Sequence, residues 1–133
     1  MTRIERIRPD GLVSSPAFSH VAVVPPGATT IYVGGQDAVD ASGVLVGEGD
    51  AAAQSVRAVE NVRTALAAAG ATFADVVQWT VLFADGVDVT AAYGAIAPRI
   101  ASDEPGLVIA ARVAGLAVPG ALVEVSAIAA VVR

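Results

Sequence analysis

One carboxylate stands alone in an apolar stretch near the C-terminal end of this 133-residue chain. Glu124 lies between "ALV" and "VSAIAA", a run that is typical of a buried strand. A carboxylate in such a run is exposed at an edge, is paired, or has a raised pKa and can act as a general base. From the residues alone, edge exposure and acid–base chemistry are equally open.

Two adjacent glycines end an earlier apolar run, "IYVGGQ", residues 31–36. Glycine at a strand end allows another group to approach the backbone closely, so Gly34 and Gly35 could offer N–H groups to a ligand. The alternative is a bulge or a turn without a ligand, and the residue pattern by itself favours that alternative.

A single cation interrupts a third apolar run, "PGLVIAARVAG", residues 105–115. An unpaired guanidinium in a core is costly, because its desolvation is not compensated. Arg112 therefore holds an anionic ligand, pairs with a carboxylate, or points at water from an edge.

Other catalytic machinery is not indicated. The chain has no Cys and one His, His20, which reads as a strand-end residue rather than half of a Ser–His pair. Phosphate-binding, dinucleotide-binding, G-x-S-x-G and H-E-x-x-H motifs are not found. We expect no metal and no cofactor.

The composition of the chain limits the kinds of partner that it is expected to bind. The net charge is −5 and no basic cluster is found, so we expect no nucleic-acid ligand. Hydrophobic residues make up 55% and charged residues 16%, yet no apolar run is long enough to span a membrane. We expect the surplus apolar surface to meet further copies of the chain. The charged first fourteen residues do not resemble a signal peptide, and we expect a cytoplasmic location.

The first half of the chain predicts strands and then a helix. Residues 3–8 suit an edge strand, and residues 20–24 and 30–34 suit a hairpin closed by "PPGA". Residues 50–69 predict a helix with Asp50 as N-cap and Gly70 after its end. Its apolar stripe consists of Val56, Val59, Val62, Leu66 and Ala69.

The second half predicts a strand over 75–85, a helix from Asp88 to about residue 101, and strands over 107–113 and 121–130. Pro98 is expected to kink or shorten that helix. The order predicts one α+β domain over residues 1–133, with a mixed sheet and two helices on one face. The other sheet face is also apolar, and a partner subunit is the simplest cover.

Taken together, these segments resemble the RidA (YjgF, L-PSP endoribonuclease-like) family. "IYVGGQ" resembles the family's IYVSGQ, and "PGALVEVSAIA" resembles its closing LPkgALVEIeAIA. The stretch 47–85, with "AQSVRAVENVRTALAAAGATFADVVQWTVLFAD", resembles its most recognisable block. The resemblance covers nearly the whole chain.

The resemblance implies a chorismate mutase-like fold and a homotrimer, with three sheets forming a central barrel and ligand clefts between subunits. Family members hydrolyse 2-imino acids or enamines to 2-keto acids and ammonia without a metal or cofactor. An arginine grips the substrate carboxylate, and a glutamate positions or activates the attacking water.

Carried over by position, the glutamate is Glu124 and the glycine of SGQ is Gly35. The serine of SGQ is replaced by Gly34, and the tyrosine of GPYSQ by Phe18. The family's asparagine aligns loosely with Tyr93.

The arginine is missing. Alignment from "VAGL" and "ALVEV" puts Val108 at its position, whereas alignment from Pro105 puts Leu107 there. Neither side chain binds a carboxylate, which by analogy with truncated charge pairs weakens transition-state binding by about 2–5 kcal/mol. Arg112 cannot replace it: it lies about 13 Å along the strand from Val108, or on the face opposite to Leu107. We expect Arg112 to pair with a carboxylate of a neighbouring strand or subunit.

Three functions follow. The favoured one is a divergent family member whose inter-subunit cleft takes a small metabolite, with Glu124 as its catalytic residue and without the standard 2-imino acid deaminase activity. Its cleft would be lined by Phe18, Gly34, Gly35, Tyr93 and Leu107 or Val108. The alternatives are a standard enamine/imine deaminase acting on 2-iminobutanoate or 2-iminopropanoate, and a non-catalytic trimeric ligand-binding or regulatory protein.

Overall fold

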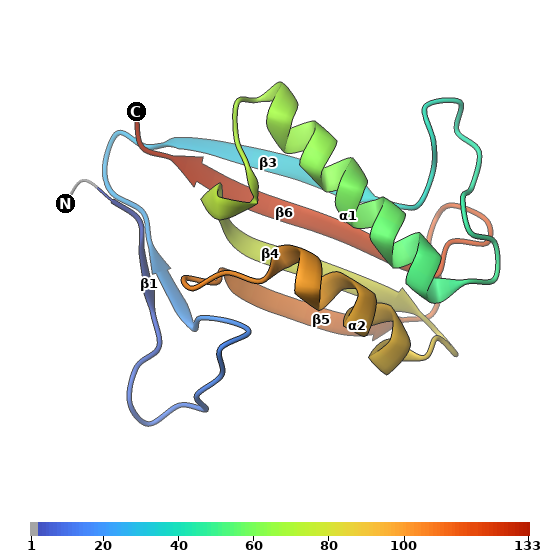
Figure 1. Cartoon of the computed structure of the whole chain (residues 1–133), viewed down its shortest axis with the longest axis horizontal. Coiled ribbons are helices and arrows are strands. Elements are labelled where there is room, and N and C mark those ends of the chain that lie inside the picture. Colours follow the sequence, from blue (N-terminus) through green and yellow to red (C-terminus); the bar gives the residue numbers. More distant parts are fainter. Residues whose placement is uncertain (1–2) are drawn as a thin grey trace.

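The structure, a computed structural model, describes residues 3–133 and places two helices on one face of a mixed sheet (Figure 1). Residues 1 and 2 of the predicted domain lie outside the described residues. The elements are β1 (Glu5–Ile7), β2 (Val21–Val23), β3 (Thr29–Gln36), α1 (Ala51–Ala68), the 3-10 helix η1 (Phe73–Asp75), β4 (Val76–Ala84), α2 (Val89–Ile100), β5 (Leu107–Val113) and β6 (Val123–Val131).

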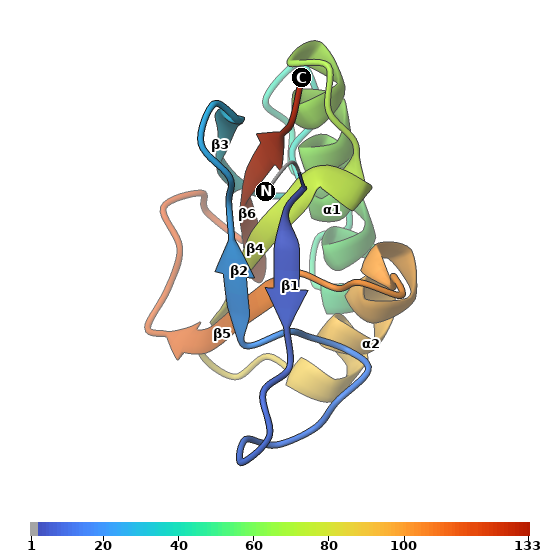
Figure 2. The ribbon, with the colours of Figure 1, turned by 90° about the vertical axis from the view of Figure 1, so that its left-hand side faces the viewer.

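The main sheet has the strand order β3-β6-β4-β5. β4 and β5 run parallel, and β6 pairs antiparallel with both β3 and β4. Viewed from the end, both helices lie on one side of this sheet and leave its other side uncovered (Figure 2). The predicted α+β fold with two helices on one face is confirmed.

The two faces of the sheet differ in burial. On β6, Val123, Val125, Ala127 and Ala129 are buried towards the helices. Side chains of β4 and α1 complete that core: Trp79, Val81, Phe83, Val59, Val62 and Leu66. The strand residues that alternate with these core residues point away from the helices, onto a surface that we call the open face. It carries Tyr32, Gln78, Thr80, Leu82, Leu107, Ile109, Glu124, Ser126 and Ile128.

Local signals set the limits of α1 as predicted. The Asp50 side chain accepts a hydrogen bond from the Ala53 N–H at 2.9 Å, which caps the first turn. Gly70 has a φ of +76°, and the two backbone bonds around it close the last turn as in a Schellman motif. Within the predicted stripe, Val59, Val62 and Leu66 are buried.

α2 also begins at its predicted cap, because the Asp88 side chain accepts from the Ala91 N–H. Pro98 does not shorten α2, because the helix continues to Ile100. The proline stands in the last turn, where its missing N–H removes a single hydrogen bond close to the natural end.

The predicted hairpin of residues 20–24 and 30–34 is wrong. The turn exists, with Gly27 at a φ of +83°, but β2 pairs with β1 in a separate two-stranded sheet (Figure 2). β3 instead pairs with β6, from Thr29 opposite Val131 onwards. Pro25 and Pro26 lack the N–H groups that would start a ladder beside the turn, and β6 offers β3 a much longer partner.

A buried glutamine ties α1 to two loops. The Gln54 side chain is fully buried, and its Nε2 donates to the carbonyls of Gly47 and Gly120 at 3.1 and 3.2 Å. Its Oε1 accepts from the Leu122 N–H at 2.8 Å. Leu122, the residue just before β6 and two positions before Glu124, is therefore held to the helix.

We predict that Gln54→Ala lowers the free energy of unfolding by about 2–4 kcal/mol, because it leaves buried backbone groups without partners. Chemical denaturation followed by circular dichroism measures the change. Thr64→Ala, on an exposed part of the same helix, is the control and changes stability by less than about 0.5 kcal/mol. Equal effects of the two substitutions would contradict this role for Gln54.

Candidate functional site

Glu124 lies on the open face, beside an irregularity in β3. Val33 pairs with Ala127 and Gln36 pairs with Val125, so the two glycines between them oppose the single residue Ser126. This β-bulge brings the Gly35 backbone against Glu124. A Cβ atom on Gly35 would lie 2.6 Å from both Cδ and Oε2 of Glu124, whereas Gly34 has open space. A side chain at position 35 would therefore displace the Glu124 carboxyl group from this place.

Asp37, which no sequence pattern indicates as a site residue, lies next to Glu124. Because Gln36 is opposite Val125 in an antiparallel pair, the following residue comes opposite Glu124. The Asp37 residue is only 6% exposed, and its Oδ1 is buried without a hydrogen-bond partner. Two carboxyl groups are therefore brought together at the end of β3.

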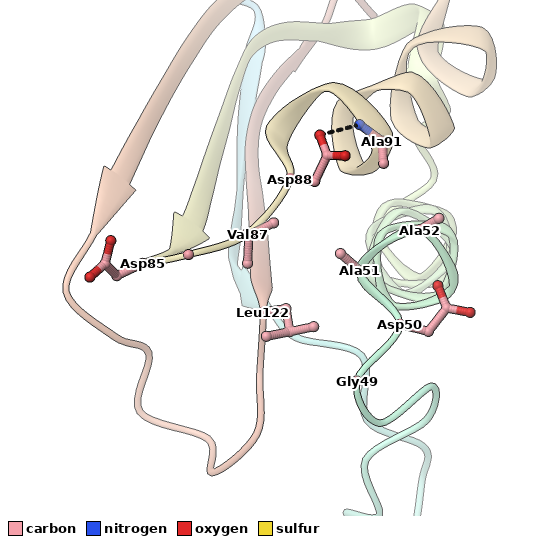
Figure 3. A pocket seen from close by; sticks show the side chains of 10 residues that line it. Gly49, Asp50, Ala51, Ala52, Asp85, Val87, Asp88, Ala91 and Leu122 are labelled. Atoms are coloured by element: carbon pink, nitrogen blue, oxygen red, sulfur yellow. Dashed lines mark hydrogen bonds between the residues drawn. The ribbon is translucent and has the colours of Figure 1, made fainter.

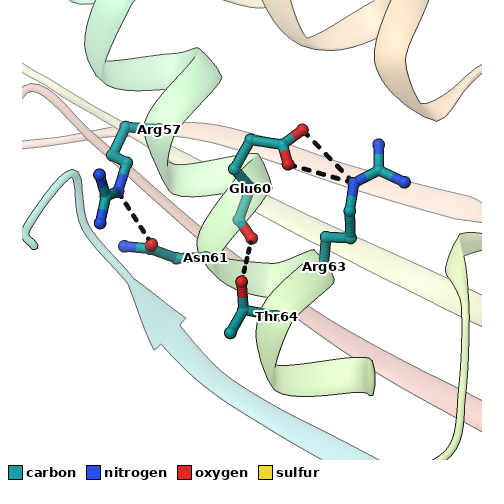
Figure 4. A network of polar contacts seen from close by, with 5 residues as sticks. All are labelled: Arg57, Glu60, Asn61, Arg63 and Thr64. Atoms are coloured by element: carbon teal, nitrogen blue, oxygen red, sulfur yellow. Dashed lines mark hydrogen bonds and ion pairs between the residues drawn. The ribbon is translucent and has the colours of Figure 1, made fainter. Parts of the chain in front are cut away.

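Helix α1 holds the backbone of this segment. Asn61 Nδ2 donates to the carbonyls of Asp37 and Val39, at 3.0 and 2.9 Å. Arg57 Nε donates to Asn61 Oδ1 at 3.0 Å and fixes the amide in that orientation (Figure 4). The position of Asp37 is consequently set by the helix face as well as by the strand.

The pKa of Asp37 is raised to about 6. Burial is the largest cause, followed by the charge of Glu124 and a side-chain hydrogen bond with it. Two adjacent carboxylates repel each other, so the pair keeps one proton at a higher pH than an isolated aspartate does. The site can hold or release a proton near pH 6.

The two alternatives for the arginine position fall on opposite faces of the sheet. Val108 is opposite Trp79 and packs against the core, on the helix side. Leu107 is opposite Gln78 and lies on the open face, as Glu124 does. Within one chain, Leu107 and Glu124 are two strands and four residues apart, a separation of about 16 Å.

Phe18 lies near Leu107 rather than near Glu124. The Ser19 N–H donates to the Gly106 carbonyl at 3.2 Å, which ties the Phe18 segment to the start of β5. The Phe18 ring contacts His20 edge to face at 5.3 Å, and its carbonyl accepts from Arg8 Nε.

Tyr93 is on α2 and half-buried, and burial raises its pKa. It lines a cavity of about 500 Å³ together with Pro16, Ala17 and Ile100. The predicted site residues thus form separate groups within one chain: the glycines with Glu124, Phe18 with Leu107, and Tyr93 beside the loop before Phe18.

Arg112 is not part of the open face. It is opposite Phe83, and its Nη1 donates to the Val87 carbonyl at 2.8 Å. In residues 3–133 the ion pairs are Arg3–Glu104 and Glu60–Arg63. The expected carboxylate partner within the chain was therefore wrong, because a backbone carbonyl takes that place.

A cavity of about 660 Å³ lies where α1 and α2 begin (Figure 3). Its two capping carboxylates, Asp50 and Asp88, already accept backbone hydrogen bonds. Among residues 3–133, no group of three or more His, Cys, Asp or Glu side chains could hold a metal ion. In that same range, no helix is both long and apolar enough to cross a membrane.

Comparison with known protein families shows to which family the chain belongs. The family model described as Endoribonuclease L-PSP matches residues 11–131. The chain belongs to this family. A search of curated proteins found no match.

Solved structures agree with that assignment. A Yersinia pestis protein of unknown function from the Rid family, YyfB, is 32% identical, with 97% of this chain and 98% of that one covered and a TM-score of 0.83. Rv2704 of Mycobacterium tuberculosis, from the YjgF/YER057c/UK114 family, is 27% identical over 97% and 100% of the chains, with a TM-score of 0.64. The Escherichia coli YjgF protein is 27% identical over 83% and 85%, with a TM-score of 0.68. The RidA-type assignment is confirmed.

We predict that Asp37→Asn makes the protein more stable at pH 7.5 and reduces the pH dependence of its stability between pH 4 and 6. The pKa of Asp37 rises from 3.8 to about 6 on folding, so the folded state binds more protons in this window. The contribution of Asp37 to stability is full below pH 4 and is lost as the pH rises through 6, by on the order of 3 kcal/mol.

Urea unfolding midpoints of wild type and Asp37→Asn, measured from pH 4 to 8, test this difference. Asp10→Asn makes the same charge change at an exposed position and is the control. A parallel pH dependence for wild type and Asp37→Asn would contradict a shared proton.

Proposed function

We propose that this protein is a divergent, cofactor-free Rid-type hydrolase, with Glu124 as its catalytic carboxylate and a small metabolite as its substrate. We further propose that its activity on 2-imino acids is low. The observation that carries this proposal is Leu107, one of the two positions at which the family resemblance calls for arginine and the one that lies on the same face of the sheet as Glu124.

The chemistry that Glu124 would perform is hydrolysis of a carbon–nitrogen double bond. Its carboxylate takes a proton from water as the oxygen bonds to carbon, and the π electrons move to nitrogen. The carboxylic acid then protonates nitrogen. When the substrate enters as the protonated imine, its nitrogen now carries three hydrogens. The carbon–nitrogen bond breaks as the hydroxyl oxygen forms the carbonyl, ammonia leaves, and the hydroxyl proton passes through the carboxylate to ammonia, which regenerates the carboxylate.

Leucine at position 107 removes the main contact for a substrate carboxylate. A bidentate arginine forms two charge-assisted hydrogen bonds, which an apolar side chain cannot replace. Loss of one partner of a desolvated charge pair costs about 2–5 kcal/mol. At about 1.4 kcal/mol per decade, that is a rate loss of roughly thirty- to several-thousandfold.

We propose that the site is completed between subunits of a homotrimer. Two observations support this: Leu107 and Glu124 are about 16 Å apart in one chain, and the open face exposes large apolar side chains. Tyr32 is 76% exposed and Ile109 is 49% exposed. The ribonuclease in the family's description is a weaker candidate, because the chain has a net charge of −5 and one histidine.

We predict that light scattering gives three times the chain mass of 13.2 kDa. Tyr32→Asp places a charge in the covered face and is expected to shift the protein towards monomer. A wild-type monomer would contradict clefts between subunits.

We predict that the wild type hydrolyses 2-iminobutanoate, generated in situ by a threonine dehydratase, at close to the buffer rate. Leu107→Arg is expected to raise that rate at least about tenfold, because it restores the charge-assisted pair. Leu107→Gln, which is polar but uncharged, is the matched control and gains nothing. Glu124→Gln combined with Leu107→Arg removes the gain.

Two outcomes separate the alternatives. Wild-type turnover far above the buffer rate that Glu124→Gln abolishes would identify a standard deaminase and contradict the proposed loss of activity. An assembled Leu107→Arg trimer that stays inactive would favour a non-catalytic binding protein.

A further inference from the structure

The Asp37 and Glu124 carboxyl groups lie side by side on the open face, and within residues 3–133 neither of them is in an ion pair. Their contact is close enough for a hydrogen bond when one of them is protonated. Asp37 Oδ1 remains without a partner, although the residue is 6% exposed. A buried acceptor without a donor is unfavourable, so the pair lacks a hydrogen-bond donor among the described residues.

The basic residues of the chain are engaged elsewhere. The sequence has eight arginines and no lysine. Each arginine has its own partner: Glu104 for Arg3, the Ala74 and Val76 carbonyls for Arg6, and Phe18 O for Arg8. The others bind Asn61 (Arg57), Glu60 (Arg63), Ala95 O (Arg99), Val87 O (Arg112) and Ala69 O (Arg133).

The elements around the pair bring no other free charge. From α1, Arg57 directs its Nε to Asn61 Oδ1. In the loop after β3, the Asp40 carboxylate accepts from the N–H groups of Ser42 and Val44. From β4, the residue opposite Glu124 is Leu82, and from β3 the bulge offers glycine.

We propose that Asp37 and Glu124 together bind the protonated nitrogen of a small amine or iminium ligand. This inference rests on the proposed function, because Glu124 is the carboxylate on which that function depends. It adds Asp37 as a second binding residue, and it names the substrate class: a cationic nitrogen compound that needs no carboxylate for recognition.

The charge of the carboxyl pair favours a cationic ligand over an anionic one. An ammonium or iminium group donates charge-assisted hydrogen bonds to two carboxylates and cancels their repulsion. A substrate carboxylate placed nearby is repelled, and Leu107 offers it no compensating cation. The pair and the apolar residue at position 107 therefore favour the same kind of ligand.

Two small ligands that share an isopropyl group and carry opposite charges test the proposal: isopropylammonium and isobutyrate. Each is titrated into the full-length, ¹⁵N-labelled protein at pH 7.5, with the amides of Gly35 and Gln36 as reporters. We expect isopropylammonium to shift these amides and isobutyrate at equal concentration to leave them unchanged.

The variants assign the effect to the pair. Asp37→Asn and Glu124→Gln each remove one negative charge at nearly constant shape, and each should weaken isopropylammonium binding about tenfold or more. Asp10→Asn removes an exposed charge away from the site and should leave the affinity unchanged.

The wild type alone provides a second measurement that does not depend on a variant folding. A proton and the cation compete for the same two carboxyl groups, and the pKa of Asp37 is about 6. The affinity for isopropylammonium should therefore fall severalfold between pH 7.5 and pH 5.

Three results would each overturn the proposal: isobutyrate binding as well as isopropylammonium, unchanged cation affinity in a folded Asp37→Asn variant, or no amide shift with either ligand. These readouts report binding and not turnover. Cation binding without a gain of deaminase activity in Leu107→Arg would locate the failure in the proposed hydrolase function instead.

Discussion

The bulge in β3 is the constraint on which the candidate site depends. Two glycines oppose one residue of β6, so the strand changes which side chains face which way. Gly35 leaves room for the Glu124 carboxyl group, and Asp37 follows on the same face. If the same residues paired regularly beyond Val33 and Ala127, without a bulge, Asp37 would come opposite Val123 and face the helices. The register shift at the bulge therefore brings Asp37 and Glu124 together.

The rest of the fold holds this bulge from both sides. Gln54 binds the loop before β6 to α1, and Asn61 binds the chain after β3 to the same helix. Both are polar side chains whose amides satisfy backbone groups that have left the sheet ladder. α1 thus packs on the core through its valines and leucine, and it positions the site through its amides.

Much of the fold could be predicted because its signals are local. Asp50, Asp88 and Gly70 act within one turn of the helix ends that they mark. The hairpin prediction failed because strand pairing is a choice between distant partners. Turn residues at 25–28 showed where the chain bends, but β6, about a hundred residues later, competes for β3.

By itself the sequence determined the helices, most strands, the family and the isolated Glu124, because caps, periodicity and motif order are written in neighbouring residues. Only the tertiary structure decided which face each strand residue occupies at the site. β5 is apolar on both faces, so alternation could not distinguish Leu107 from Val108, and its pairing with β4 does. Asp37 was hidden for a related reason: a bulge reverses the period of two, and a bulge is visible only where two strands are in register.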